Sequence, residues 1–409
     1  MSQNSLNPPK NYSKSLQYII FLLFLLGPLT GNVINVLFGV LSSYFEVTTD
    51  SVLIAIPAFM FPFAITQLFS GAISDVKGRV PVLIVGLILF TIAMLIATLS
   101  FNLEIYIIAN VIGGIGFGFI NPVLIALMTD ITPRSDLPKK MGYLGASANL
   151  GVGLGPLIAS QMILIGWQSI YILFIVITIF CLIYFIMVKS GPQKVSDDPG
   201  IRTFLTQISI EWRRFVVIIM VISAFLIAHT YIAINIWTSK ILAHIIDTTI
   251  IGIVLGLAGI GAAISGILTG ARIKRKGVRI PLITGSLVLI LSLINLIIVG
   301  DITHPDRFIF IIPGWILAGI SGGILFTIIT FYSQVLSPER RGVLAGSLTA
   351  AYFIGIALVI TTLAPFSNMF GITGVYITIL IISLIFIITI IVLYISAKRV
   401  KSSQGKFIL

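Results

Sequence analysis

The sequence has 409 residues, of which 58% are hydrophobic and 9% charged, and its formal net charge is +12. A soluble globular protein carries about 25% charged residues, so this composition excludes that class. A membrane-spanning helix needs roughly 20 mostly apolar residues, and the apolar content is enough for about a dozen such helices. The uninterrupted apolar runs 172–188 and 377–395 predict helices rather than the alternating strands of a membrane barrel.

Charged and Gly/Pro-rich breaks divide the chain into twelve candidate spans, each long enough to cross a bilayer. In chain order they are residues 18–43, 52–74, 81–100, 104–128, 141–165, 168–188, 215–237, 249–271, 281–300, 308–333, 343–364 and 373–396. The longest polar stretch separates them into six and six. We therefore expect an all-α membrane protein with two six-helix bundles, residues 1–188 and residues 215–409 with their basic tail. Residues 189–214 form the predicted cytoplasmic linker.

The distribution of basic residues predicts the orientation of the chain. With the N-terminus inside, 23 of the 25 Lys and Arg residues lie on the cytoplasmic side, and Lys240 and Arg307 lie outside. This asymmetry favours a multi-pass protein of the cell membrane with both termini in the cytoplasm. The basic cluster in residues 272–279 is an orientation signal in this interpretation, and contact with anionic lipid is its alternative. Because the asymmetry explains the net charge, we expect no nucleic-acid partner.

Small residues recur at a nearly constant offset between the two predicted bundles. Gly71-x3-Asp75-x2-Gly78 after the second span returns as Gly270-x3-Lys274-x2-Gly277 after the eighth, 199 residues later. Two further pairs of spans repeat Gly114, Gly118 and Pro133 as Gly319, Gly323 and Pro338, and Gly142 and Gly151 as Gly346 and Gly355. Offsets near 200 at three places predict two pseudo-symmetric halves derived from a duplication.

The loop after the second span reads Gly71-Ala-Ile-Ser-Asp75-Val-Lys77-Gly78-Arg79. It resembles the signature G-x-x-x-D-R/K-x-G-R-K/R of the major facilitator superfamily, which lies in the same loop in that family. The resemblance implies the major facilitator fold and a cytoplasmic gate formed by Gly71, Asp75, Gly78 and Arg79. Glycine permits close helix approach, and Asp75 can pair with a helix N-terminus or with a basic residue of the other bundle. A short turn with solvated charges is the alternative.

The fifth span carries a second motif, Gly142-x8-Gly151-x3-Gly155-Pro156-x2-Ala159-Ser160. It resembles the antiporter motif G-x8-G-x3-G-P-x2-G-G, with two other small residues in place of the final glycines. Small residues at this spacing form a groove for a neighbouring helix, and the proline bends its own helix. The resemblance implies the drug/proton antiporter branch of the superfamily and therefore an exporter. Generic helix packing is the alternative.

The fourth span departs from that branch. Where antiporters often have R-x-x-Q-G, this chain has Asn110-Val-Ile-Gly113-Gly114. A neutral amide cannot shift the pKa of a carboxylate as a buried cation does. None of the 13 acidic residues lies in the middle of a predicted span, although proton relays generally use intramembrane carboxylates or histidines. His229 is therefore the candidate for proton coupling, with Glu46 and Asp50 at the outer ends of the first two spans as the fallback.

Amide and imidazole side chains inside the spans are the candidates for the substrate cavity, since spans 1, 4, 7 and 10 line it in the family. These residues are Asn32, Asn35, Asn110, Asn121 and His229. The alternative for each is an interhelical hydrogen bond without substrate contact, worth about 0.6 kcal/mol on average. Asn121 has a further alternative, the capping of a kink at Pro122.

Together these features predict a monomeric secondary transporter in the lipid bilayer that exports lipophilic, drug-like small molecules in exchange for protons. The missing central acids argue against strongly cationic cargo. The alternatives are an importer or facilitator of a neutral solute, and a non-transporting lipid scramblase or sensor on the same scaffold. We expect no enzymatic activity, cofactor or metal site, because the spans contain no zinc-ligand spacing and no paired carboxylates.

Overall fold

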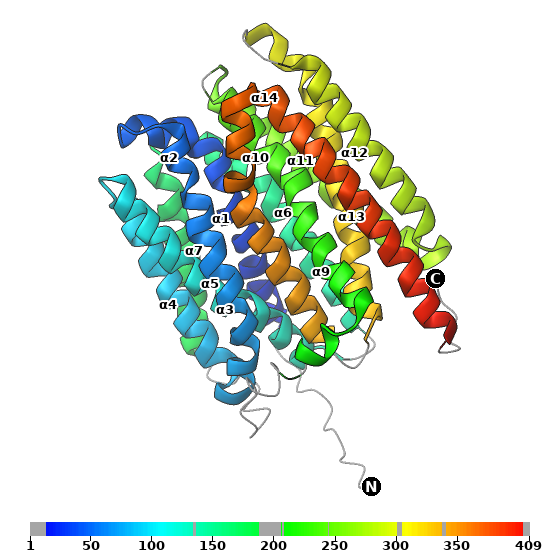
Figure 1. The fold of residues 1–409 in the computed structure, drawn as a ribbon. Helices are drawn as coiled ribbons and strands as arrows, with labels where there is room; N and C mark the ends of the chain where they lie inside the picture. The colour runs from blue at the N-terminus through cyan, green and yellow to red at the C-terminus, as the bar shows by residue number, and fades with distance from the viewer. Residues whose placement is uncertain are drawn as a thin grey trace.

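The computed structural model describes residues 14–133, 136–187, 206, 208–243, 245–300, 305–337 and 341–403, and its elements are helical (Figure 1). The first half contains α1 (Lys14–Tyr44), α2 (Thr49–Leu53), α3 (Ala55–Lys77), α4 (Arg79–Thr98), α5 (Leu103–Ile131), α6 (Leu137–Met162) and α7 (Gln168–Met187). The second half contains α9 (Phe215–Ile227), η1 (Ala228–Ile232), α10 (Ala233–Leu242), α11 (Thr248–Lys276), α12 (Arg279–Val299), η2 (Pro305–Phe310), α13 (Ile312–Val335) and α14 (Arg341–Ser403). Most of the predicted linker and the end of the basic tail lie outside the described residues.

The described residues confirm the twelve predicted spans. Ten helices are long and apolar enough to cross a membrane by length and composition. The glycine-rich α6 is not one of these ten, but it packs between α1 and α11 as a further span. α14 counts once among the ten, although its backbone leaves the helical conformation at Gly371 (φ 62°), between the eleventh and twelfth predicted spans. Counting α6 and both parts of α14 gives twelve.

Several helices begin at a side chain that accepts a hydrogen bond from the first turn, as short polar residues do at helix N-termini. The Asn102 side chain accepts from the backbone N–H of Ile105 at 2.9 Å, and the Asp247 carboxylate accepts from that of Thr249 at 2.7 Å. Hydrogen bonds from the side chain and backbone of Thr249 also lower the pKa of the Asp247 carboxyl. This acid therefore stays ionised at neutral pH at the start of α11.

The two halves repeat one packing pattern. In the first half, α1 packs on α6, α5 packs on α3 and α4, and α4 packs on α7. In the second half, α9 packs on α14, α13 packs on α11 and α12, and α12 packs on α14. If the spans are numbered one to twelve, each pair in the second half has the numbers of a pair in the first half plus six. The fold is therefore the pseudo-symmetric pair of six-helix bundles that the sequence offsets predict.

The repeat extends to single backbone positions. Gly78 ends α3 with φ 93°, and Gly277 ends α11 with φ 75°, a region that glycine enters without steric cost. A Cβ on Gly114 of α5 would collide with the carbonyl oxygen of Phe59, and one on Gly319 of α13 would collide with that of Ala258. Glycine therefore brings two helix backbones together at equivalent places in both halves.

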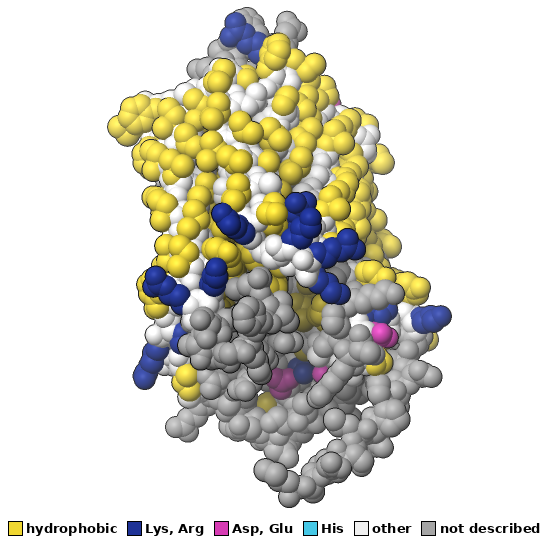
Figure 2. Space-filling model, turned by 90° about the vertical axis from the view of Figure 1, so that its right-hand side faces the viewer, with side chains coloured by type: hydrophobic (Ala, Val, Ile, Leu, Met, Phe, Trp, Pro, Cys, Tyr) yellow, Lys and Arg dark blue, Asp and Glu magenta, His cyan; other side chains and the backbone are white. Residues whose placement is uncertain are grey.

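The halves contact each other through two long helix pairs, α6 with α11 and α3 with α14. α1 begins and α14 ends at the same end of the molecule (Figure 1). We call this end the basic end, because the helix termini Lys77 and Lys276 lie there, and we call the other end the opposite end. Isoleucine and leucine side chains are exposed on the sides of the bundle (Figure 2), as expected for a surface in contact with lipid.

Candidate transport site and gates

Arg79, a residue of the predicted gate, is the centre of an ion-pair cluster at the basic end. It begins α4 and is only 6% exposed. Its guanidinium pairs with Asp75 at the end of α3, donates from Nε to Asp130 of α5 at 2.9 Å, and donates to the Ser74 hydroxyl at 2.6 Å. A guanidinium can serve several acceptors because its N–H groups point in fixed, separate directions. One side chain thus joins three helices of the first half.

The sequence prediction included Asp75 and Arg79 but missed Asp130. The Asp75 side chain remains 42% exposed, while that of Asp130 is 23% exposed. All the partners of Arg79 in this cluster belong to the first half, so the cluster does not bridge the halves in this conformation. The exposed carboxylate of Asp75 is the member that a group of the second half can approach. The position of Asp130, two residues after the end of the predicted span 104–128, was the available clue to its role.

The motif glycines of α6 face the first half. A Cβ on Gly151 would collide with the carbonyl oxygen of Leu25, and one on Gly155 would lie 2.6 Å from that of Leu29. Both contacts are with α1, so this part of the motif forms the groove in which α1 lies. Gly142 also lies in α6, near its start at the basic end.

The other face of α6 contacts the second half through Gly153, which the motif does not include. A Cβ on Gly259 of α11 would collide with the Cα atom of Gly153. Closer to the opposite end, a Cβ on Gly252 would lie 2.7 Å from the carbonyl oxygen of Pro156 and would also collide with Ser160. Backbone contact between α6 and α11 therefore runs from mid-helix to the opposite end.

An ion pair also joins the halves at the opposite end. Lys240, in the last turn of α10, pairs with Asp50 of α2, and its ammonium lies 4.6 Å from the centre of the Trp237 ring. Next to it, a Cβ on Gly39 of α1 would lie 3.2 Å from the carbonyl oxygen of Ala243. The opposite end is closed by these contacts.

The helices at the basic end are less tightly packed than those at the opposite end. Three glycines near the basic ends of α3, α6 and α11, Gly71, Gly145 and Gly270, have no atom within 4 Å of the position of an added Cβ. Gly145 and Gly270 belong to α6 and α11, whose backbones touch at Gly153 and Gly259, farther from the basic end. Closure at one end and separation at the other is the geometry of one end state of a rocking two-bundle transporter.

An aromatic cluster lies where the two halves meet, at the contact between α3 and α14. Phe63 of α3 and Phe353 of α14 contact each other edge to face with ring centroids 4.4 Å apart. Phe353 also contacts Tyr352, whose ring centroid lies 4.9 Å from that of Phe326 of α13. Phe117 of α5 also contacts Phe63, with ring centroids 5.9 Å apart. The rings form a continuous apolar surface from one half to the other.

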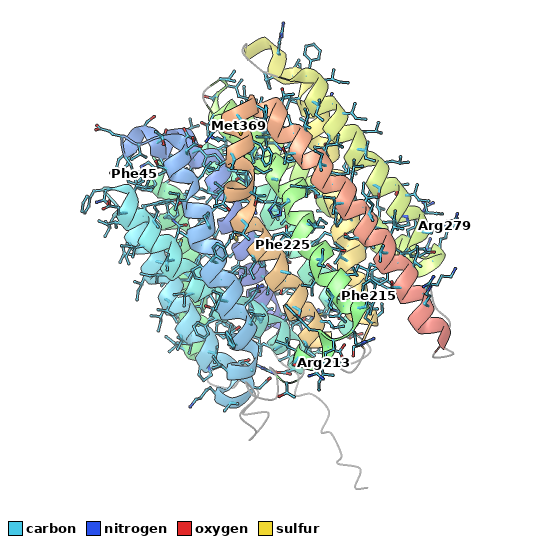
Figure 3. The ribbon with its side chains drawn as sticks, in the orientation of Figure 1. Phe45, Arg213, Phe215, Phe225, Arg279 and Met369 are labelled. Carbon is cyan, nitrogen blue, oxygen red and sulfur yellow. The ribbon has the colours of Figure 1, made fainter. Side chains whose placement is uncertain are left out.

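His229 lies in η1, a single turn of π-helix that interrupts the seventh span between α9 and α10. The side chain is 2% exposed. Its ring lies against that of Phe225, with the centroids 4.9 Å apart and the planes tilted by 37°. Figure 3 labels Phe225. The His229 Nδ1 lies 3.3 Å from the Phe225 carbonyl oxygen, and Nε2 lies 3.3 Å from the Thr362 hydroxyl of α14. Isolated π-helical turns occur frequently at functional sites. Sequence periodicity did not indicate this turn, because its extra residue changes only the local register.

The four predicted cavity asparagines occupy different surroundings. Asn32 donates to the carbonyl oxygen of Pro28 at 2.7 Å, one turn earlier in α1, and Asn35 is 4% exposed with no hydrogen-bond partner for its Oδ1 among the described residues. Asn110 donates to the Tyr106 carbonyl at 2.8 Å, and Asn121 is half-buried. Among the described residues, no hydrogen bond links any two of these four or links one to His229.

Asn110 lines a small cavity of about 20 Å³ inside the first half, roughly the room that one water molecule needs. The hydroxyls of Tyr106 and Tyr171 hydrogen-bond to each other at its edge, and Thr30 and Phe59 also line it. All the lining residues belong to α1, α3, α4, α5 and α7. One lining residue, Phe59, connects the cavity to the aromatic cluster, because its ring centroid lies 6.1 Å from that of Phe63.

Two pseudo-symmetric six-helix bundles that meet along two helix pairs are the architecture of a membrane transporter. The family model of the Major Facilitator Superfamily matches residues 20–360 and again residues 240–408. The chain belongs to this superfamily, a family of transporters, and is a multi-pass membrane protein.

Two bacterial resistance proteins are similar to parts of this chain. Quinolone resistance protein NorA of Staphylococcus aureus is 27% identical over 206 residues, covering 49% of this chain and 51% of NorA. Multidrug resistance protein 2 of Bacillus subtilis is 34% identical over 101 residues, a quarter of each chain. The match spans about half or less of the length of these relatives.

Two solved structures share the fold over nearly the whole chain. A D-xylose–proton symporter has a TM-score of 0.75 at 15% identity, with 93% of this chain and 97% of that chain covered. A POT family transporter in complex with 5-aminolevulinic acid has a TM-score of 0.76 at 14% identity, with 95% and 98% covered. At these identities the likeness concerns the fold.

Proposed function

We propose that the protein exports lipophilic, aromatic small molecules from the cell by alternating access, in exchange for protons. The observation that carries the proposal is the edge-to-face contact of Phe63 and Phe353 between the two halves. When the halves separate, these rings become available to a ligand, and aromatic pairs add about 0.5–1.5 kcal/mol beyond area burial. The names of the relatives, which refer to quinolone and multidrug resistance, support a drug-like substrate.

The charge distribution favours uncharged or weakly anionic compounds. Every described Asp and Glu side chain lies within a few residues of a helix end, so the middle of the region between the halves holds no described carboxylate. A cation would lose its hydration there without gaining a counter-charge. The same observation favours a second candidate function, the facilitated diffusion of a neutral solute, because such transport needs no proton-binding group.

His229 is the proposed proton-coupling residue. It contacts both α9 and α14, so a change in its charge acts on the packing of the seventh span against the eleventh. Asp50 is the second candidate, because its protonation would remove the ion pair with Lys240 that joins the halves. Glu46 lies in the same turn region, between α1 and α2.

The two ends of the molecule have proposed roles as gates. The basic end is proposed to face the cytoplasm of the cell membrane, following the distribution of Lys and Arg. The structure is then inward-facing, and Asp75 with Arg79 forms the cytoplasmic gate when the basic end closes. The substrate path lies between two halves of one chain, which is consistent with a monomer.

Proteoliposomes with an imposed proton gradient and an internal pH dye test the proposal. We expect addition of a neutral aromatic compound to release protons with wild-type protein and not with His229→Gln, while Thr362→Val retains release. Empty liposomes and an equally lipophilic aliphatic compound are the controls.

Two other outcomes would change the proposal. Proton release that survives His229→Gln but not Asp50→Asn would show that Asp50, at the opposite end, is the coupling residue. Uptake of a labelled compound without any proton movement would refute antiport and support the facilitator.

A further inference from the structure

The second half exposes a group of cations at the basic end. Among the described residues of α11, α12 and α14, the exposed cations are Arg272, Lys274, Arg275, Lys276, Arg279, Lys398 and Arg399. None of the ion pairs between described residues includes one of them. Residues 248–299 and 341–403 contain no Asp or Glu at all. These cations therefore have no acidic partner on their own helices.

The cations continue the faces that these helices present to lipid. On α11, Ile264 and Leu268 are 54% and 64% exposed, and Arg272 follows at the same spacing of four residues. Residues four apart lie on one face of a helix. On α12 the order is reversed, since Arg279 comes first and the exposed Ile283 follows.

α14 shows the same arrangement. The exposed Ile391 and Ile395 are followed by Arg399 at the same spacing, with Lys398 beside it. α12 packs on α14, and the start of α12 and the end of α14 both lie at the basic end. Figure 2 shows Lys and Arg side chains gathered along the border of the apolar surface on this side of the molecule. Three exposed apolar helix surfaces thus end in cations at the basic end.

The equivalent loop of the first half is different. Arg79 is buried and engaged with Asp75 and Asp130, which leaves Lys77 as the exposed cation between α3 and α4. An orientation signal requires only basic residues on one side of the membrane. It does not require them to lie along the lipid-facing side of three neighbouring helices.

We propose that Arg272, Arg275, Arg279, Lys398 and Arg399 form a lipid-phosphate surface that binds anionic phospholipids, such as phosphatidylglycerol, in the leaflet at the basic end. Guanidinium groups bind phosphate oxygens through paired N–H donors, and the adjoining exposed isoleucines contact the acyl chains. This surface lies apart from the aromatic cluster between the halves and binds lipid whatever substrate is transported.

Native mass spectrometry of the full-length protein tests this surface. The purified protein is titrated with phosphatidylglycerol or with phosphatidylcholine of the same acyl chains, and the bound lipids are counted. Each cation near an anionic surface contributes about five-fold. We expect Arg272→Gln/Arg275→Gln/Arg279→Gln to lower the preference for phosphatidylglycerol on the order of 100-fold. Replacing the same three arginines by lysine keeps most of this preference, and Lys77→Gln, a single cation of the first half, lowers it by about five-fold at most.

A second variant covers the case in which the triple Gln protein does not fold. Lys398→Gln/Arg399→Gln should lower the preference on the order of 25-fold by the same reasoning. Equal binding of both lipids by the wild-type protein would overturn the proposal. A loss of preference in Lys77→Gln as large as that in the triple Gln variant would also overturn it. If millimolar inorganic phosphate displaces all phosphatidylglycerol, the surface binds free phosphate and the assignment to lipid is wrong.

Discussion

Lys240 of α10 and Asp50 of α2 form an ion pair that joins the two halves at the opposite end. The Lys240 side chain is 15% exposed and lies against the ring of Trp237, whereas that of Asp50 is 63% exposed. An ion pair with one exposed partner contributes about 0.2–1 kcal/mol, which corresponds to a change of at most about five-fold in a ratio of conformations. The pair is suited to biasing an equilibrium rather than to locking it.

Removal of this pair should shift the protein toward the conformation that is open at the opposite end. We expect Asp50→Asn to increase that population by about two- to five-fold. The measurement is the distance between spin labels on cysteines that replace Leu99 and Ile298. Both residues lie at the opposite end of the molecule, after α4 and in the last turn of α12, and they are 68% and 78% exposed. Cys181, the single native cysteine, is buried. The swap Asp50→Lys/Lys240→Asp should restore the wild-type distribution, and unchanged distances in Asp50→Asn would exclude a role for the pair.

The contact between Gly153 and Gly259 predicts a steric effect on closure. Gly259→Ala places a methyl group against the Cα atom of Gly153, and overpacking of this kind costs about 1–3 kcal/mol. We expect a lower thermal unfolding midpoint in detergent and slower transport. Gly270→Ala is the matched control in the same helix, because no atom lies within 4 Å of its added Cβ. Equal effects of the two substitutions would show that the close contact is unimportant.

The cluster around Arg79 predicts unequal effects of its two acids on stability. Asp130→Asn removes the less exposed carboxylate from a buried guanidinium, and loss of a buried partner costs up to about 3–5 kcal/mol. Asp75→Asn removes a carboxylate that is 42% exposed and should cost about 1 kcal/mol or less. Thermal unfolding of the purified variants compares them. A larger loss in Asp75→Asn than in Asp130→Asn would contradict this assignment.

Asp75 has a separate predicted effect on conformation. If it pairs with a group of the second half when the basic end closes, Asp75→Asn should favour the state that is open at the basic end. Spin labels at Lys77 and Lys276, at the basic ends of α3 and α11, report this opening. Asp136→Asn is the control, because Asp136 is an exposed acid outside the motif. An unchanged distance distribution in Asp75→Asn would remove the gate role.

The aromatic cluster predicts a substrate-dependent loss of affinity. Phe353→Leu keeps an apolar side chain but removes the ring that meets Phe63, which should weaken binding of aromatic compounds by about two- to ten-fold. Transport assays over a range of compound concentrations measure the change in apparent KM. Phe370→Leu, at a position on α14 that is 63% exposed, is the control. Equal loss for aromatic and aliphatic compounds would indicate a packing defect instead.

Most of the fold could be predicted from the sequence because hydropathy and charge dictate where a helix can cross a membrane. The offset between the halves likewise predicted the equivalent positions of Gly78 and Gly277. The helix ends were less predictable, and several helices extend beyond the predicted spans into polar residues, as α11 does to Lys276.

The gates were only partly predictable, because a sequence does not show which neighbour a small or charged residue contacts. Gly151 and Gly153 are two residues apart on α6, yet one contacts α1 and the other contacts α11. Motif spacing identified Gly151 and not Gly153. Asp130 and Lys240 gain their roles from partners 51 and 190 residues away, which local patterns cannot indicate.

The most direct test of alternating access measures both ends of the molecule in the same membrane. Spin-label pairs at positions 99 and 298 and at positions 77 and 276 are recorded in proteoliposomes, with and without a proton gradient and a neutral aromatic compound. We expect the distance at the opposite end to lengthen as the distance at the basic end shortens. Transport of the compound with both distances unchanged, or with both ends opening together, would contradict alternating access by these two halves.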